Sequence, residues 1–490
     1  MEEVLNVGPF LGTCSQLSMS HLCVREVDDA GHSKARYVVS SDGPCYRLED
    51  HVRVPDAPPL RRRLLAVFLP TGYPATVSPD YTTYHIYNAL QTFFSAIASL
   101  LASRAVLQGL GVGDESASAT DAMLLSVLQE SMGRVATIMF AHKVGSRIEA
   151  ECKMYRLLAD ILNDTAMVSD CLSPVLPKMV RVPLLGMSSI FRALCGIAGG
   201  SSKATLSVHF ARAANVGELN AKDASQETVV SLLGMWVGGV IVSHASSTTA
   251  TWIWLLVLMV GHLATNYLAV SAVSVHSINR QRANIIFSSL MNTDHVPSPT
   301  EVAEQERIFQ RSPIVRSSHG RILGRCEIGV PFGNILKHID RRMKLVSSES
   351  ASAKEQVDIS EVCASLIDDH YILWIDSDTR KAQIVLTDRA SVRGQLKAWS
   401  HAIRVMTELS SSSQGSQRSN SSEKNQTTTA RSRAARISQR ELLWLIQSTR
   451  LDHQAVFDGW MQRIEDAGWD TEASTSALET TKKYRIVVDE

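Results

Sequence analysis

Two long apolar runs lie close together near the middle of the chain, at residues 228–243 and 250–275. Neither run contains Asp, Glu, Lys or Arg, and the residues between them are mostly small and polar. The second run has about 26 residues, which exceeds the ~20 that a helix needs to cross a bilayer core, whereas the first, with about 16, is marginal. The pattern predicts a membrane helical hairpin, preceded by a polar connector at residues 196–227.

Further apolar runs of helical length precede the hairpin. The hydrophobic spacing predicts helices over about 81–110, 116–142, 148–172 and 178–199, with glycine and proline residues between them to end each helix. Beyond residue 320 the pattern changes, because HYILWID and KAQIVLT alternate as the strands of a hairpin do. The predicted fold class is therefore mainly α, a helical membrane bundle of about six long helices followed by a small α/β C-terminal domain.

Shifts in composition divide the chain into segments. Residues 410–435 are rich in serine and of low complexity, which is typical of disorder. The segments that we predict are an N-terminal segment with short strands around Asp42–Gly43 (1–66), a helical membrane domain (67–290), a linker (291–319), a small α/β domain (320–408), a disordered Ser-rich linker (409–436), and a C-terminal helix and strand (437–490).

Charge and cysteine usage narrow the class of protein. The 490 residues include 49 Lys and Arg against 49 Asp and Glu, so no global field attracts nucleic acid. None of the eight cysteines forms a C-x-x-C pair, and eight in a chain of this length do not indicate a disulfide scaffold. The acidic start MEEV resembles neither a secretory signal nor a transit peptide. We therefore expect internal helices to direct the protein to a membrane, mitochondrial or another intracellular one.

Several polar side chains interrupt the predicted helices at spacings of four residues. Residues i and i+4 share a helix face, and ionisable groups inside a membrane must pair or line a watery cavity. Ion pairing within the bundle is favoured over a substrate path, and both interpretations stay open. The candidate intramembrane polar residues are Glu130, Arg134, Arg156, Asp160, Asp164, His262 and Asn266.

Glycine spacing indicates helix packing rather than nucleotide binding. Gly234 and Gly238 form a G-x-x-x-G motif, which lets two helices approach closely, and packing within one chain is favoured over dimerisation. Gly109 and Gly111 have the spacing that begins a dinucleotide fingerprint, but Asp114 stands where its third glycine is needed. No hydrolase, P-loop or kinase signature is present, and the histidines lack metal-site spacing. We expect no enzyme activity, no cofactor and no metal.

Five stretches, in a fixed order, resemble the RUS (root UV-B sensitive) family. They are FLPTGYPATVSPDYTTYHIYNALQ, AVLQGLGVGDESASAT, YRLLADILNDTAM, GGSSKATLSVHFA and NVGELNAKDASQETVVSLLG. The resemblance covers about residues 63–290 and implies a link to UV-B responses and vitamin B6 homeostasis, and in plants to auxin transport, with some members in plastids. The family has no accepted catalytic residues, so the resemblance assigns none here.

Three functions remain after this reading. The favoured one is a non-enzymatic integral membrane protein of the RUS family with a homeostatic or signalling role. The alternatives are a small-molecule transporter and a soluble helical enzyme whose apolar runs form a buried core. The expected partners are membrane lipid and a family paralogue or second copy of the chain, and no nucleic acid.

Overall fold

The computed structural model describes most of the chain. The described residues are 21–27, 33–40, 46–48, 67–109, 119–213, 215–245, 247–310, 314–337, 339, 359–364, 369–376, 379–419, 439–472, 478 and 484–487. They form two compact units, one from Met1–Tyr81 with Ser207–Leu232 and the other from Thr82–Leu206 with Leu233–Glu490.

The first unit begins with a three-stranded antiparallel sheet. Strand β2 (Ser33–Ser40) pairs with β1 (His21–Val27) on one side and β3 (Tyr46–Leu48) on the other. The strand pair predicted around Asp42–Gly43 is confirmed as β2 and β3, and its turn lies outside the described residues.

Polar side chains also join two distant segments of the first unit. Glu218 accepts hydrogen bonds from the backbone and the hydroxyl of Thr71, both at 2.8 Å. Gln226 donates to the Phe68 carbonyl at 2.6 Å, and His209 contacts Asp80 at 2.9 Å. Residues around 67–80 and 207–226, which include parts of three of the five family-like stretches, therefore fold against each other.

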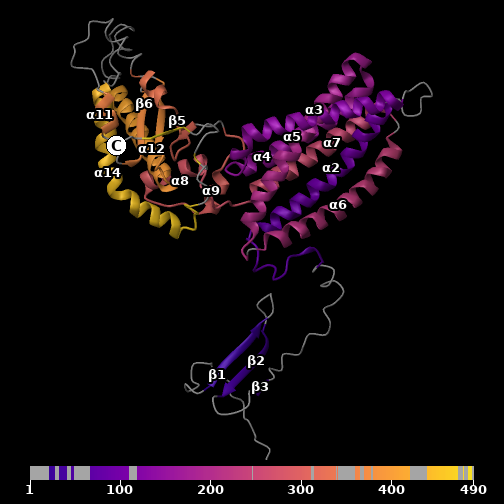
Figure 1. The fold of residues 1–490 in the computed structure, drawn as a ribbon, viewed down its shortest axis with the longest axis horizontal. Coiled ribbons are helices and arrows are strands. Elements are labelled where there is room, and N and C mark those ends of the chain that lie inside the picture. The colour runs from indigo at the N-terminus through magenta and orange to yellow at the C-terminus, as the bar shows by residue number, and fades with distance from the viewer. Residues whose placement is uncertain are drawn as a thin grey trace, which may run out of the picture. The chain divides into compact units, whose positions relative to one another are not determined.

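Six helices of 21 to 33 residues occupy the described chain between Tyr81 and Ser271. Their apolar surfaces meet where α2, α4 and α7 run side by side, around Leu101, Met167 and Leu255 (Figure 1). The six helices are α2 (Tyr81–Gly109), α3 (Ala119–Ile148), α4 (Cys152–Leu172), α5 (Lys178–Phe210), α6 (Val216–His244) and α7 (Thr248–Ser271).

Four of these six helices, rather than all of them, are long and apolar enough to cross a membrane: α2, α5, α6 and α7. The predicted bundle of about six membrane helices is corrected to four candidates. Helices α3 and α4 each carry five charged residues, which lowers their mean hydropathy. The number of charged residues in each helix therefore indicates better than its length whether the helix could cross a membrane.

The predicted polar connector before the hairpin is wrong. Helix α5 continues to Phe210, passing through Pro183 and the glycines expected to end it, and α6 begins at Val216. The polar residues at the start of α6 are helical because their side chains bond to a neighbouring segment, as Lys222 does to the Val67 carbonyl at 2.9 Å. Helix α6 has 29 residues, not about 16. At 1.5 Å per residue it reaches roughly 44 Å, so its length is no longer marginal.

Gly234 and Gly238 mark the line along which α6 packs against α2. A Cβ atom at Gly234 would lie 2.8 Å from the Cβ of Ala96 and 2.9 Å from the carbonyl oxygen of Phe93. At Gly238 it would lie 2.8 Å from Leu100 Cδ1. The G-x-x-x-G face therefore lies against α2 of the same chain.

The C-terminal part of the second unit is a mixed five-stranded sheet covered by helices. Its strands run in the order β4-β5-β7-β6, with β8 beside β7; β6 and β7 form the predicted antiparallel hairpin, and β5 is parallel to β7. Helix α12 packs against β5, β6 and β7 and against α8 and α14 (Figure 1). The strands are β4 (Ile314–Arg316), β5 (Ile322–Ile328), β6 (Tyr371–Asp376), β7 (Lys381–Thr387) and β8 (Arg485–Ile486). The helices are α8 (Arg280–Thr293), α9 (Pro299–Gln305), α11 (Ile359–Ala364), α12 (Val392–Ser419) and α14 (Gln439–Asp466).

Two of the predicted linkers contain regular structure. Within residues 291–319 the structure places α9, which begins with a capping box at Ser298 and Glu301, and strand β4, which pairs with β5. Within residues 409–436, α12 continues to Ser419. The rest of that Ser-rich segment lies outside the described residues.

Two buried histidines link α12 to α14. His401 contacts the Tyr371 hydroxyl at 3.0 Å and the Ile446 carbonyl at 3.1 Å, and His453 contacts the Ser400 hydroxyl at 2.8 Å. Both side chains are fully buried. Burial lowers the pKa of His401 to about 4 and that of His453 to about 3, so both are neutral at pH 7.

These histidines should make the C-terminal region less stable in mild acid. The pKa of His401 falls from 6.5 in the unfolded chain to about 4 in the fold, so the unfolded chain binds more protons below pH 6.5. The histidine's contribution is present above pH 6.5 and is lost as the pH falls toward 4, by about 3 kcal/mol in total. Thermal unfolding followed between pH 7 and 4 should show this loss. The slope should flatten in His401→Gln and stay unchanged in the exposed control His319→Gln; equal slopes in all three would contradict the assignment.

Candidate functional site

Helix α4 turns an unusually polar face toward the interior of the bundle. Arg156, Asp160 and Asp164 follow one another at intervals of four residues, which puts them on one stripe of the helix. Asp160 and Asp164 are 5% and 2% exposed. On the facing helix α7, His262 and Asn266 have the same spacing and are 1% and 0% exposed. The predicted stripes therefore lie on two helices that pack together.

The two stripes form one network of hydrogen bonds, which we call the α4–α7 network (Arg156, Asp160, Asp164, His262 and Asn266). Arg156 donates to Asp160 at 2.9 Å, and His262 Nδ1 contacts Asp164 at 2.8 Å. His262 Nε2 lies 3.5 Å from the second oxygen of Asp160, and the Asn266 amide donates to that same oxygen. Asp160 is thus the shared acceptor at the centre of the network.

The charges of the network are close to balance. Two carboxylates face one guanidinium and one imidazole, so the sum is −1 with His262 neutral and zero with His262 protonated. Among the described residues, Asp164 Oδ2 and Asn266 Oδ1 accept no hydrogen bond although both are buried. A buried acceptor without a donor is unfavourable, and a water, proton or polar solute would satisfy it. The network can therefore serve as a structural tie or as a polar site.

The pair Glu130 and Arg134 behaves differently from the network. The two side chains form an ion pair at 2.6 Å on α3, as their spacing predicts. They are, however, 66% and 76% exposed, and the structure does not bring them to the α4–α7 network. They make a surface pair of the kind that contributes little to stability.

Sequence reasoning missed partners that come from distant parts of the chain. Asn88 on α2 accepts a hydrogen bond from Arg156 at 3.1 Å and so ties a third helix to the network. Farther along α4, the buried Asp170 accepts a hydrogen bond from Ser188 of α5 at 2.6 Å. A single polar residue such as Asn88 has no spacing pattern around it, so no local signal could have identified it.

A buried ionic triad, also unpredicted, joins α4 to the C-terminal region. Glu306 accepts from Lys153 at 2.7 Å and forms an ion pair with Arg282 at 2.9 Å, and all three side chains are less than 8% exposed. Burial acts to raise the pKa of Glu306, but the charges of Arg282 and Lys153 outweigh it and hold the pKa below its usual value. The carboxylate is therefore ionised and fixes α4 to α8.

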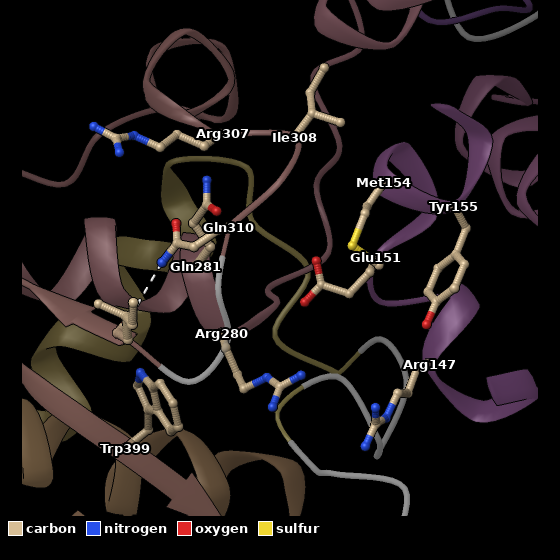
Figure 2. A pocket seen from close by; sticks show the side chains of 11 residues that line it. Arg147, Glu151, Met154, Tyr155, Arg280, Gln281, Arg307, Ile308, Gln310 and Trp399 are labelled. Atoms are coloured by element: carbon tan, nitrogen blue, oxygen red, sulfur yellow. Dashed lines mark hydrogen bonds between the residues drawn. The ribbon is translucent and has the colours of Figure 1, made fainter. Parts of the chain in front are cut away.

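Close to this triad is a cavity of about 110 Å³ lined by arginine, glutamate and tryptophan side chains (Figure 2). Arg147 enters it from the last turn of α3, Glu151 from the start of α4, and Arg280 from the first residue of α8. Trp399 of α12 closes another side. This cavity, which we call the arginine cavity, holds none of the residues predicted from the sequence.

The fold and these sites define a mainly helical protein with four helices apolar enough to cross a membrane, a buried polar network, and a small mixed sheet at the C-terminus. Residues 56–294 match a family model described as a vitamin B6 photo-protection and homoeostasis domain. Residues 295–480 match one described as root UVB sensitive protein, C-terminal. The chain belongs to the RUS family, as the resemblance indicated.

Relatives from two organisms support the same family. The chain is 39% identical over 250 residues to RUS family member 1 of Dictyostelium discoideum, and 32% identical over 277 residues to protein root UVB sensitive 3 of Arabidopsis thaliana. It is 28% identical over 285 residues to the Arabidopsis protein root UVB sensitive 2, chloroplastic. These alignments cover 50%, 56% and 57% of this chain and 47%, 63% and 64% of the relatives. The chain thus spans about half to two thirds of their lengths, and no solved structure matches it.

Proposed function

We propose that this RUS-family chain is an integral membrane protein that acts in vitamin B6 homeostasis or UV-B signalling without catalysing a reaction itself. The observation that carries the proposal is the distribution of polar and apolar side chains over its helices, which is the reverse of that in a soluble protein. The α4–α7 network is buried, whereas apolar side chains cover the outer faces of α6 and α7. A soluble protein places apolar groups inside, and a membrane protein turns them toward lipid.

The exposed apolar surface is large on both helices of the hairpin. Trp236 and Val240 on α6 are 74% and 50% exposed, and Val257 and Val260 on α7 are 58% and 69% exposed. Monomeric soluble proteins seldom expose continuous apolar patches of this kind. The arrangement supports lipid as the partner and disfavours the soluble enzyme, whose apolar runs would have to be buried.

The role in vitamin B6 homeostasis rests on the family and its description. We place the protein in an intracellular membrane, mitochondrial or another, acting alone or with a second copy or paralogue. Cells that lack the protein should show altered pools of the B6 vitamers, and re-expression of the chain should restore them. Unchanged vitamer pools in the deletion, under both normal light and UV-B, would contradict this role.

A small-molecule transporter is the second candidate, and the α4–α7 network is the observation that favours it. Polar groups buried between helices are typical of substrate and proton pathways. Uptake into vesicles containing the purified protein would separate the two functions. Transport requires that His262→Gln abolish uptake while the exposed-pair variant Glu130→Gln leaves it unchanged. Absence of uptake for every B6 vitamer tested would support the non-transporting role.

The loop between α6 and α7 should lie on the opposite side of the membrane from the C-terminal region. The segment His244–Ala250 contains no Lys or Arg, whereas Arg280 and Arg282 follow the far end of the hairpin, and basic residues stay on the cytoplasmic side. One basic side chain, Arg104, does reach the loop, where it donates to the carbonyls of Val242 and Ala245 at 3.0 and 2.9 Å.

Single cysteines at Ser247 and Ser317, in a chain without its native cysteines, would test this topology on sealed vesicles. An impermeant maleimide should label one position from outside and the other only after the membrane is opened. Labelling of both positions from the same side would contradict the hairpin.

A further inference from the structure

The arginine cavity carries more positive charge than its neighbours balance. Within the described part of the chain, the guanidinium groups of Arg147 and Arg280 line it against the one carboxylate of Glu151, which leaves one positive charge. The nearby cations Lys153 and Arg282 are already paired with Glu306. Among the described residues, neither Arg147 nor Arg280 forms an ion pair, and the Nε atom of each is buried without a hydrogen-bond partner.

A buried donor on α12, which also lines the cavity, lacks a partner as well. Trp399 is 1% exposed, and within the described part of the chain its indole Nε1–H donates to no acceptor. Buried indole groups usually find an acceptor, because leaving the donor unpaired is unfavourable. The missing acceptor and the surplus charge therefore point to the same kind of ligand, one that is anionic and rich in oxygen atoms.

The electrostatics of the cavity walls agree with this geometry. Burial lowers the pKa of Arg280, and the charge of Arg147 lowers it further, against the opposing effect of Glu151. Burial also raises the pKa of Glu151, although Arg280 and Arg282 act in the opposite direction. Two like charges held near each other in a partly buried space are relieved by an anion between them.

We propose that the arginine cavity binds the phosphate group of a small ligand, held by Arg147 and Arg280 with the Trp399 indole as a further donor. A phosphate carries about −1.5 to −2 charge and three strong acceptor oxygens, so it offers acceptors to both guanidinium groups and to the indole, whereas a carboxylate has only two oxygens. The cavity of about 110 Å³ is several times the ~10–15 Å³ that one water needs, so it admits a phosphate group. The first residue of α8, Arg280, lies at the end of the helix that favours anions.

Inorganic phosphate, pyridoxal 5′-phosphate and a short-chain phosphatidic acid share this chemistry and represent a free ion, a soluble ester and a lipid headgroup. Each would be titrated by calorimetry into the full-length chain in detergent at constant ionic strength, with pyridoxal as the control without phosphate. At least one phosphate ligand should bind saturably at one site per chain, and pyridoxal should not bind. The tightest of the three identifies the source. Binding of none of them would overturn the inference.

Variants of the cavity walls should change the affinity in opposite directions. Arg280→Gln should weaken phosphate binding by about tenfold or more, because a charge-assisted hydrogen bond is lost. Glu151→Gln should tighten binding by several fold, because it removes the opposing charge, and Trp399→Phe should weaken it by several fold. Arg393→Gln, at an exposed ion pair with Asp458, is the matched control and should bind as the wild type does.

Thermal unfolding of each variant would confirm that it folds. An unchanged affinity in Arg280→Gln, or no gain in Glu151→Gln, would contradict the assignment. If inorganic phosphate binds but pyridoxal 5′-phosphate does not, the site stands while the role in vitamin B6 homeostasis loses support. If vitamer pools change in the deletion but no phosphate ligand binds, the role in vitamin B6 homeostasis is supported and the phosphate site is contradicted.

Discussion

Replacing Asp160 with leucine should lower the free energy of unfolding by about 3–5 kcal/mol, because the change leaves Arg156, whose side chain is only 11% exposed, without its carboxylate. Asp160 is the shared acceptor for Arg156 and Asn266, and its own side chain is 7% exposed. Arg156 would keep its hydrogen bond to Asn88, which is uncharged and cannot offset the loss. Denaturant-induced unfolding of the purified chain in detergent would measure the difference.

Helix α3 offers a matched control for this variant. Glu130 and Arg134 have the same spacing and form an ion pair of similar length, but their side chains are 66% and 76% exposed. Glu130→Leu should therefore change the free energy of unfolding by no more than about 0.5 kcal/mol. Similar losses in the two variants would show that Asp160 is not the buried partner of Arg156.

Replacing Gly234 with alanine should destabilise the hairpin by about 1–3 kcal/mol, because one added methyl group overfills the contact between α6 and α2. The new Cβ atom would come within 2.9 Å of the carbonyl oxygen of Phe93, and a backbone atom cannot move aside as the end of a side chain can. Thermal unfolding, read as loss of helical signal, would report the change.

Gly239 is the control for this substitution, since it lies on the same helix and a Cβ atom there would meet nothing within 4 Å among the described residues. Alanine at that position should be neutral or stabilising by up to about 1 kcal/mol, because alanine favours the helix. Equal stability of the two variants would contradict the close contact between α6 and α2 at Gly234.

The helices that could be predicted from the sequence are those with continuous apolar runs. Helix α7 was predicted within a few residues at each end, because its pattern alone is enough to specify it. Helix α6 was predicted at about half its length, since its first turns are polar and are held by Thr71 and the Val67 carbonyl. Such long-range contacts leave no periodic signal in the sequence. An apolar run therefore predicts only the part of a helix that does not depend on contacts with distant residues.

The residues of the α4–α7 network could be predicted from the sequence, but the contacts between them could not. The spacing of four placed Arg156, Asp160 and Asp164 on one face, yet nothing in the sequence indicated that this face meets His262. The arginine cavity was not predicted at all, because its residues come from positions as far apart as Arg147 and Trp399. Residues that meet only through the tertiary fold cannot be grouped from a single sequence.

Whether the helical bundle resides in a membrane is tested most directly by alkaline carbonate extraction of membranes from cells that produce the full-length chain. Carbonate releases proteins that are held at a membrane surface by polar contacts and leaves proteins whose helices cross the bilayer. With four helices apolar enough to span it, the chain should remain in the pellet and be released only by detergent. Recovery of the chain in the carbonate supernatant would contradict the account and favour a soluble helical protein.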